Sequence, residues 1–207
     1  MSSGIAYPVF RTPDPALALS VARRMVAFGV QPYSEVSVEA EVSTLVEVRR
    51  MLDVLPGAWF TSHTAPFRLD PALARSIPDI PDMPDGDLPR DLARVADFPP
   101  FTVSLPDQQV GSVEDRFTAA AERSPAAVHW TSLSWPGAPE HDLHGEAKHA
   151  EVTLLLNCDS IELDAPADTH LVLVHVRRRN RDGYEDRMAR WLAEQIGQRV
   201  IGPPQEG

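Results

Sequence analysis

The sequence is poor in several features that define common protein classes. Its 207 residues include one cysteine, Cys158, so no disulfide can form within the chain, as is typical of a reducing compartment. No apolar run approaches the ~20 residues needed to cross a bilayer. The first residues, Met1 to Gly4, lack the charged and apolar segments of a secretory signal. These absences predict a cytoplasmic protein with no membrane partner.

Basic residues are also scarce. The chain has 19 Lys and Arg against 30 Asp and Glu, which gives a net charge of −11 and a pI near 5.0. Nucleic-acid backbones are bound by basic surfaces, so we expect no nucleic-acid partner. Lys148 is the only lysine, and all other basic residues are arginine. This bias favours a GC-rich and therefore bacterial coding sequence.

The motifs of common enzyme classes are missing as well. The chain contains no G-x-x-x-x-G-K-[ST] phosphate loop, no G-x-G-x-x-G, no G-x-S-x-G, no H-E-x-x-H and no C-x-x-C. Catalytic residues can be scattered along a chain, so these absences favour a non-enzymatic protein without excluding an enzyme. They also predict no cofactor.

The pattern of apolar residues predicts an α+β fold. Asp14 before Pro15 predicts the N-terminus of a first helix. Thr44 with Glu47 predicts a capping box for a second helix. The N-terminal half, 1–69, is therefore expected to be β-α-β-α-β, with strands over 7–11, 34–42 and 58–62.

The C-terminal half, 101–202, is richer in strands. Ser112 is predicted to cap a helix that turns Val113 and Phe117 inward. A final helix begins near Tyr184 and ends at Gly197, where glycine favours termination. Strands are predicted over 101–105, 127–135, 151–156, 160–164, 171–176 and 199–201, with a polar loop over 136–150.

A connector rich in Asp and Pro, 70–100, separates the two halves. Proline removes backbone donors, so a regular sheet cannot run through this stretch. The shared β-α-β order allows two pseudo-duplicated halves, although no residue-level repeat supports them. Because each half is small for a stable core, we predict a single α+β domain over 1–207. It would have a mixed or antiparallel sheet, helices packed on one side, and a short tail at 203–207.

The strand predicted over 34–42 offers the clearest candidate surface. Its apolar residues alternate with polar ones, so Glu35, Glu39 and Glu41 share the face opposite to the core. Exposed carboxylates can steer a basic partner and speed its association. They can also serve solubility alone.

Tryptophan is a frequent anchor in protein interfaces. Trp130 and Trp135 lie five residues apart in one predicted strand, so we expect one in the core and the other at the surface. Acidic residues of the 136–150 loop follow directly in the sequence. The predicted binding residues are therefore Glu35, Glu39, Glu41, Trp135, Glu140 and Asp142.

Histidines support an alternative, enzymatic reading. His129-Trp130-Thr131-Ser132 fits the H-x-T-x pattern that two-histidine phosphoesterases use twice, with each histidine acting as acid or base. The second copy is missing, since His175 is followed by Val176-Arg177. The loop histidines His141, His144 and His149 suit zinc as residue types, but their spacing matches no standard ligand pattern. We therefore predict no metal site.

Two further features have structural interpretations. Cys158 lies in a predicted turn beside Asp159, which does not favour a reactive thiolate. The one dense basic run, 177–181, is followed by acidic residues that can neutralise it locally.

These observations lead to one expectation and two alternatives. We expect a non-enzymatic acidic binding protein that neutralises or inhibits a basic protein partner, such as a toxin, in the manner of immunity proteins. The first alternative is a small hydrolase or phosphoesterase that uses His129 or the histidines of 141–149. The second is a structural or assembly subunit that pairs through the apolar edges near 58–62 and 199–201.

Overall fold

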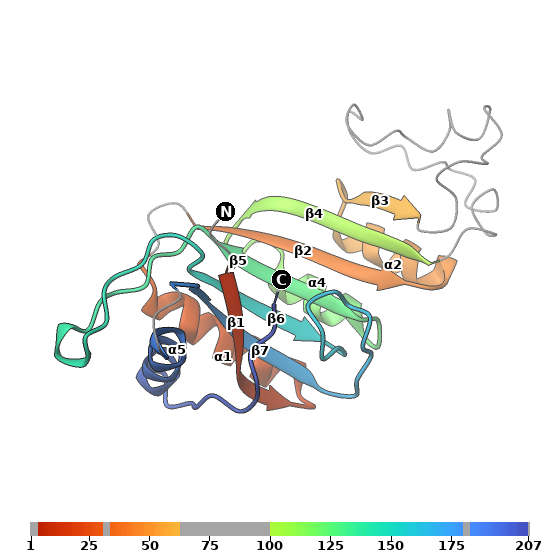
Figure 1. The fold of residues 1–207 in the computed structure, drawn as a ribbon. Helices are drawn as coiled ribbons and strands as arrows, with labels where there is room; N and C mark the ends of the chain where they lie inside the picture. Colours follow the sequence, from red (N-terminus) through yellow and green to blue (C-terminus); the bar gives the residue numbers. More distant parts are fainter. Residues whose placement is uncertain (1–3, 31–33, 63–99, 180–182, 207) are drawn as a thin grey trace.

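The computed structural model describes residues 4–30, 34–62, 100–179 and 183–206 (Figure 1). Seven strands form one sheet in the order β1-β7-β6-β5-β2-β4-β3, and all six neighbouring pairs are antiparallel. This confirms the α+β fold class. The strands are β1 Gly4–Thr12, β2 Glu35–Val42, β3 Trp59–Ser62, β4 Phe101–Gln109, β5 Ala126–Thr131, β6 Glu151–Leu156 and β7 His170–Arg177.

The strands of the two halves interleave within this sheet. β2, from the N-terminal half, lies between β5 and β4, both from the C-terminal half. β1 lies at the opposite end and pairs with β7. Because neighbouring strands come from distant parts of the chain, the two halves share one continuous sheet.

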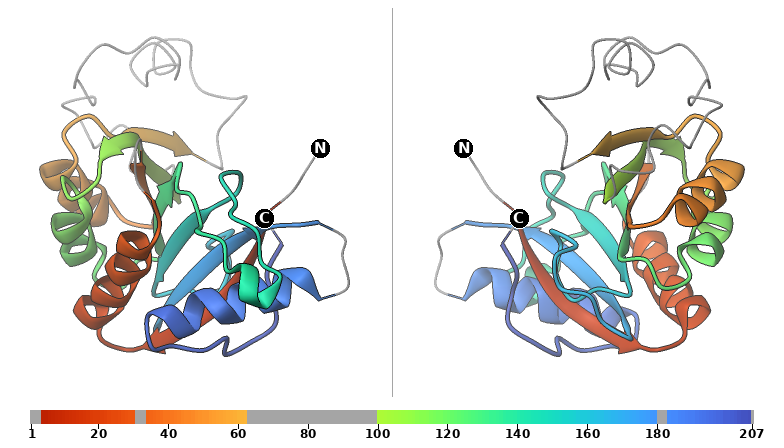
Figure 2. Two further views of the ribbon diagram at one scale, coloured as in Figure 1. Left: turned by 90° about the vertical axis from the view of Figure 1, so that its left-hand side faces the viewer. Right: turned by 90° about the vertical axis from the view of Figure 1, so that its right-hand side faces the viewer.

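In the described part of the chain, four α-helices pack on one face of the twisted sheet (Figure 2). Alternate residues of the strands point toward this layer and form the main core, as in β2, where Val36, Val38, Ala40 and Val42 are buried. The predicted arrangement of helices on one side is confirmed. The helices are α1 Pro15–Phe28, α2 Leu45–Val54, α4 Glu114–Ala121 and α5 Tyr184–Gln195, with a short 3₁₀ turn, η2, at Pro139–His141.

The local signals that start the first two helices act as predicted. Asp14 Oδ1 accepts hydrogen bonds from the backbone of Ala16 and Leu17 at the start of α1. Thr44 and Glu47 form the reciprocal capping box of α2. These caps fix where the two helices begin, and hence which of their residues meet the sheet.

The start of α4 differs from the prediction. Val113 occupies the cap position without a side-chain hydrogen bond, and the Ser112 hydroxyl instead donates to the carbonyl of Gln109. The buried Glu114 carboxylate accepts from the backbone N–H groups of Gly111 and Val113, which substitutes for a conventional cap. Val113 and Phe117 are buried as expected.

Three predicted strands are also corrected. β5 ends at Thr131, because Ser132 has a φ of 57° and turns the chain out of the sheet. The segment 160–164 is a loop, so β6 pairs with β7 rather than with a hairpin partner. Residues 199–201 form no strand, although the N–H of Ile201 donates to the carbonyl of Pro8 on β1.

The Asp- and Pro-rich connector, 70–100, lies outside the described residues except for Pro100. Among the described helices, none has both the length and the hydropathy needed to span a membrane.

Candidate interaction surface

The sheet face opposite to the helices divides into two parts. One part is apolar and is covered by the segment that follows β6. Cys158 and Leu163 of that segment pack on strand residues in a second small core. The strand residues of this core are Ala6, Ala127, Leu155, Leu171 and Leu173.

The other part of this face is polar, and we call it the polar face. It consists of the outward residues of β2 and of the strands beside it, and it includes the acidic row predicted from the sequence. Glu35 is exposed, while Glu39 and Glu41 are partly exposed. Its other members are Ser37, Thr102, Ser104, His129, Thr131, Glu151 and Thr153.

Charge on the sheet is strongly segregated. The adjacent strands β6, β5, β2 and β4 contain five carboxylates and no Lys or Arg. The four described α-helices contain seven arginines and seven carboxylates, so that layer is balanced. The acidic excess of these elements therefore lies on the strands that carry the polar face.

A row of hydrogen bonds crosses the polar face from β2 to β7. Glu39 Oε1 lies 3.1 Å from His129 Nε2, and His129 Nδ1 lies 3.1 Å from Thr153 Oγ1. Thr153 Oγ1 lies 2.8 Å from His175 Nε2. Burial, together with the neighbouring His129 and His149, lowers the pKa of His175 to about 4. His175 is therefore neutral near pH 7, and the hydroxyl of Thr153 lies between two imidazoles.

The order carboxylate, imidazole, hydroxyl resembles the layout of a catalytic triad. However, Thr153 has no exposed surface, so its hydroxyl cannot reach a substrate. The predicted His129 and Thr131 do share the outward face, while Trp130 between them points into the core. The geometry thus gives this row a positioning role: it holds Glu39 and His129 in place on the surface.

The structure corrects the prediction that Trp130 or Trp135 is exposed. Both are buried, because Ser132 turns the chain and Trp135 lies outside β5. Trp130 donates its indole N–H to Glu114 at 3.1 Å. Trp135 donates to the carbonyl of His175 at 2.7 Å and is not available as a surface contact.

Trp59 is the exposed tryptophan that the sequence analysis missed. Its exposed fraction is 49%. It pairs with Ser104 of β4, which in turn pairs with Glu39 of β2. Directly opposed residues of antiparallel strands share a face, so Trp59 lies on the same face as Glu39. The strand prediction over 58–62 was available from the sequence, but the register that places Trp59 in this row was not.

The predicted acidic residues Glu140 and Asp142 lie elsewhere. They are exposed near the tip of a projection, 132–150, that extends beyond the end of the sheet (Figure 1). Backbone bridges between Trp135 and Glu146, and between Ala138 and Leu143, join its two arms. The structure therefore separates the five predicted acidic residues into two groups, with Glu35, Glu39 and Glu41 on β2 and Glu140 and Asp142 near the tip.

The histidines of this projection do not converge. Among the described residues, no group of three or more His, Cys, Asp or Glu side chains is placed to hold a metal ion. The backbone N–H and carbonyl of His144 bond to the Tyr184 hydroxyl, which ties the projection to α5. These contacts indicate an architectural role for this part of the projection.

The described arginines of the basic run, Arg177 to Arg179, form ion pairs, but largely with residues other than those predicted. Arg179 donates to the buried Glu146 at 2.6 Å, and Arg177 lies 3.8 Å from the same carboxylate. Burial raises the pKa of Glu146, but hydrogen bonds from Arg179 and the Lys148 backbone outweigh it, so the pKa lies below its usual value. Arg178 pairs with Glu206. Of the acidic residues that follow the run, Glu185 accepts from the Arg179 backbone.

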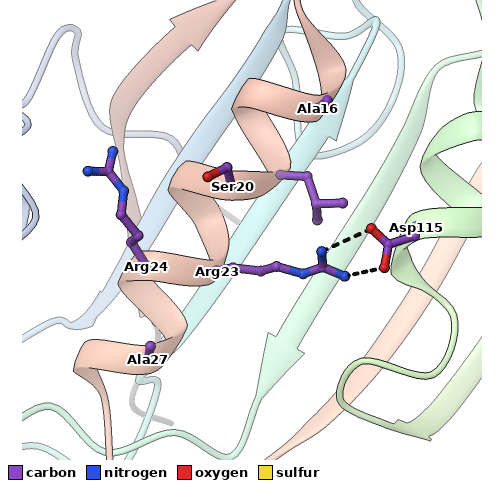
Figure 3. Close-up of a pocket in the computed structure, with 7 residues that line it drawn as sticks. Ala16, Ser20, Arg23, Arg24, Ala27 and Asp115 are labelled. Atoms are coloured by element: carbon purple, nitrogen blue, oxygen red, sulfur yellow. Dashed lines mark hydrogen bonds and ion pairs between the residues drawn. The ribbon is translucent and has the colours of Figure 1, made fainter.

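The hydrolase alternative requires a pocket that joins a histidine to an arginine of 177–181. One hollow, of about 370 Å³, lies beside α1 instead (Figure 3). Arg23 crosses it and donates to both oxygens of Asp115, at 2.9 and 2.7 Å, while Arg24 points away. A second hollow of about 240 Å³ lies between β1 and the C-terminal residues. Neither hollow contains His129, His141, His144 or His149.

Comparison with known proteins gives no further guide to the site. No family model, no curated protein and no solved structure matches the chain.

Proposed function

We propose that the protein binds a basic protein partner through the polar face. The observation that carries the proposal is the segregation of charge, with five carboxylates and no Lys or Arg on four adjacent strands. A surface of one sign attracts a partner of the opposite sign and accelerates its association. Neutralisation of a toxin, or inhibition of another basic protein, is the most specific form of this role.

The side chains on this face are suited to recognition. Glu39 is held by His129, and Glu41 accepts a 2.5 Å hydrogen bond from the Thr102 hydroxyl. An ionised carboxylate offers about four lone-pair positions, so Glu39 can accept further hydrogen bonds from a partner. Because their positions are already fixed, less side-chain entropy is lost on binding.

The test begins with capture of partners from a lysate of the source cells, using tagged protein washed at low and then high salt. A captured basic protein is then purified, and its association with the wild type is measured by surface plasmon resonance. We expect Glu39→Lys with Glu41→Lys to slow association by about tenfold or more and to flatten its salt dependence.

The matched control places the same charge change on the helical layer. Asp53 and Glu194 are exposed residues of α2 and α5. Asp53→Lys with Glu194→Lys changes the net charge equally but leaves the polar face intact. If both double variants slow association to the same extent, net charge rather than this face attracts the partner, and the proposal fails.

A further inference from the structure

The exposed tryptophan and the acidic row occupy one line across three strands. Trp59, Ser104 and Glu39 are directly opposed in β3, β4 and β2. Adjacent strands lie about 4.8 Å apart, so the backbones of Trp59 and Glu39 are roughly 10 Å apart. The next outward pair along β4 and β2 consists of Thr102 and Glu41. A large aromatic side chain thus stands across a small serine from Glu39, with Glu41 in the next outward row.

The space between Trp59 and Glu39, on either side of Ser104, suits a flat cation. An aromatic ring attracts a cation placed over its face, and tryptophan does so most strongly. Carboxylates accept paired hydrogen bonds from a guanidinium. A guanidinium stacked on the indole would point its N–H groups toward Glu39 and Glu41, whereas an ammonium would lose the planar stacking and the paired geometry.

We propose that Trp59, Glu39 and Glu41 form a site for an arginine side chain of the partner. This inference rests on the proposed function and names the chemistry that the polar face selects. The guanidinium stacks on Trp59 and donates to the two carboxylates, with Ser104 as the small residue beneath it. The exposed fractions support access to the site, at 49% for Trp59 and 36% for the Glu39 side chain.

The experiment compares hexa-arginine with hexa-lysine as probes of equal charge. Binding to the full chain is measured by calorimetry at low salt, and the indole N–H signals of the four tryptophans are followed by NMR. We expect the arginine peptide to bind about three- to fivefold more tightly, in keeping with a cation–π contact at an exposed site. The Trp59 indole signal should shift, while those of the buried Trp130 and Trp135 should not.

Variants separate this site from general attraction. Trp59→Ala should make the affinities of the two peptides equal, whereas Trp59→Phe should keep part of the preference. Leu17→Ala is the control, because Leu17 is an apolar side chain on the helical layer with a similar exposed fraction of 46%. It should leave the arginine preference unchanged. Circular dichroism confirms that each variant remains folded.

The outcomes distinguish this inference from the function on which it rests. If both peptides bind equally and only Glu39→Lys with Glu41→Lys weakens them, the acidic face binds cations but the arginine site is wrong. An arginine preference that survives in Trp59→Ala also overturns the site. If neither peptide binds at low salt, both proposals are overturned.

Discussion

The carboxylate of Glu114, which has no exposed surface, accepts a 3.1 Å hydrogen bond from the indole nitrogen of Trp130. The same carboxylate accepts from the backbone of Gly111 and Val113 at the start of α4. It therefore joins the start of α4 to Trp130 near the end of β5. Since strand residues alternate in direction, an inward Trp130 requires an outward His129, so this buried contact helps to set the polar face.

Removal of the Glu114 carboxylate should lower the free energy of unfolding substantially. Glu114→Ala leaves the buried donors of Val113 and Trp130 without their acceptor, and each such group costs about 1–3 kcal/mol. We expect the free energy of unfolding to fall by about 3 kcal/mol or more, measured by urea denaturation. The neighbouring Asp115 is an exposed partner of Arg23. Asp115→Asn should cost less than about 1 kcal/mol, and equal losses in the two variants would contradict the assignment.

The buried imidazole of His175 should make stability depend on pH. Its pKa is lowered from 6.5 to about 4 in the folded protein. Between these values the unfolded chain binds a proton that the folded protein does not, so stability is complete above pH 6.5 and falls as the pH drops toward 4. The loss should total about 3 kcal/mol over this window.

His175→Gln isolates this contribution. Glutamine can keep a hydrogen bond to Thr153 but has no proton to gain in this range. Chemical denaturation from pH 7 to pH 4 should show a shallower loss of stability in the variant than in the wild type. Parallel curves for the two proteins would show that another group dominates the acid sensitivity.

Fluorescence can test which tryptophan faces the solvent. Trp59 is half exposed, whereas Trp130 and Trp135 are buried. Acrylamide, a neutral quencher that the acidic face does not repel, should therefore quench the wild type more strongly than Trp59→Phe, in which the most accessible indole is absent. A large quenchable fraction that persists in Trp59→Phe, and disappears instead in Trp135→Phe, would overturn the placement of both residues.

The C-terminal residues should protect an edge of the sheet. Ala6 of β1 exchanges two backbone hydrogen bonds with Gln205, of 3.0 and 2.7 Å. Deletion of residues 203–207 should leave these groups on β1 unpaired, and exposed strand edges promote association between chains. We expect sedimentation to reveal concentration-dependent self-association of the truncated protein.

A point variant provides the control for this deletion. Gln205→Ala keeps the backbone pairing with Ala6 and removes only the side-chain bonds to Asp159 and Ile161. It should sediment as the full chain does. If the truncated protein also sediments as the full chain does, residues 203–207 do not protect the edge of β1 from association. That result would also weaken the alternative that the protein is an assembly subunit.

Local chemistry explains which parts of the fold were predictable. The caps at Asp14 and Thr44 and the alternation along 34–42 each depend on residues close in sequence, and the structure confirms them. The corrections involve distant contacts. Ser112 does not cap α4, because the Glu114 carboxylate accepts from the backbone N–H groups at the start of this helix. Glu114 is held there by its hydrogen bond from Trp130.

The candidate surface was predictable only in part. The outward row of Glu35, Glu39 and Glu41 follows from strand periodicity alone. Trp59 could not be assigned to this face, because its position depends on the register of β3 against β4 and of β4 against β2. Register between strands so far apart in the sequence is set by packing and by the intervening chain rather than by local pattern. The same limit concealed the approach of His175 to Thr153.

The balance of charge on the four helices and its imbalance on β6, β5, β2 and β4 separate charge across these two layers. A cation that approaches from any side therefore exerts a torque as well as a pull. Electrostatic forces act over about a Debye length, roughly 8 Å at physiological salt. When a cation comes within this distance, the torque turns the polar face toward it before any side chains are in contact. If the proposed basic partner exists, this separation of charge would bias the orientation of its approach as well as its rate.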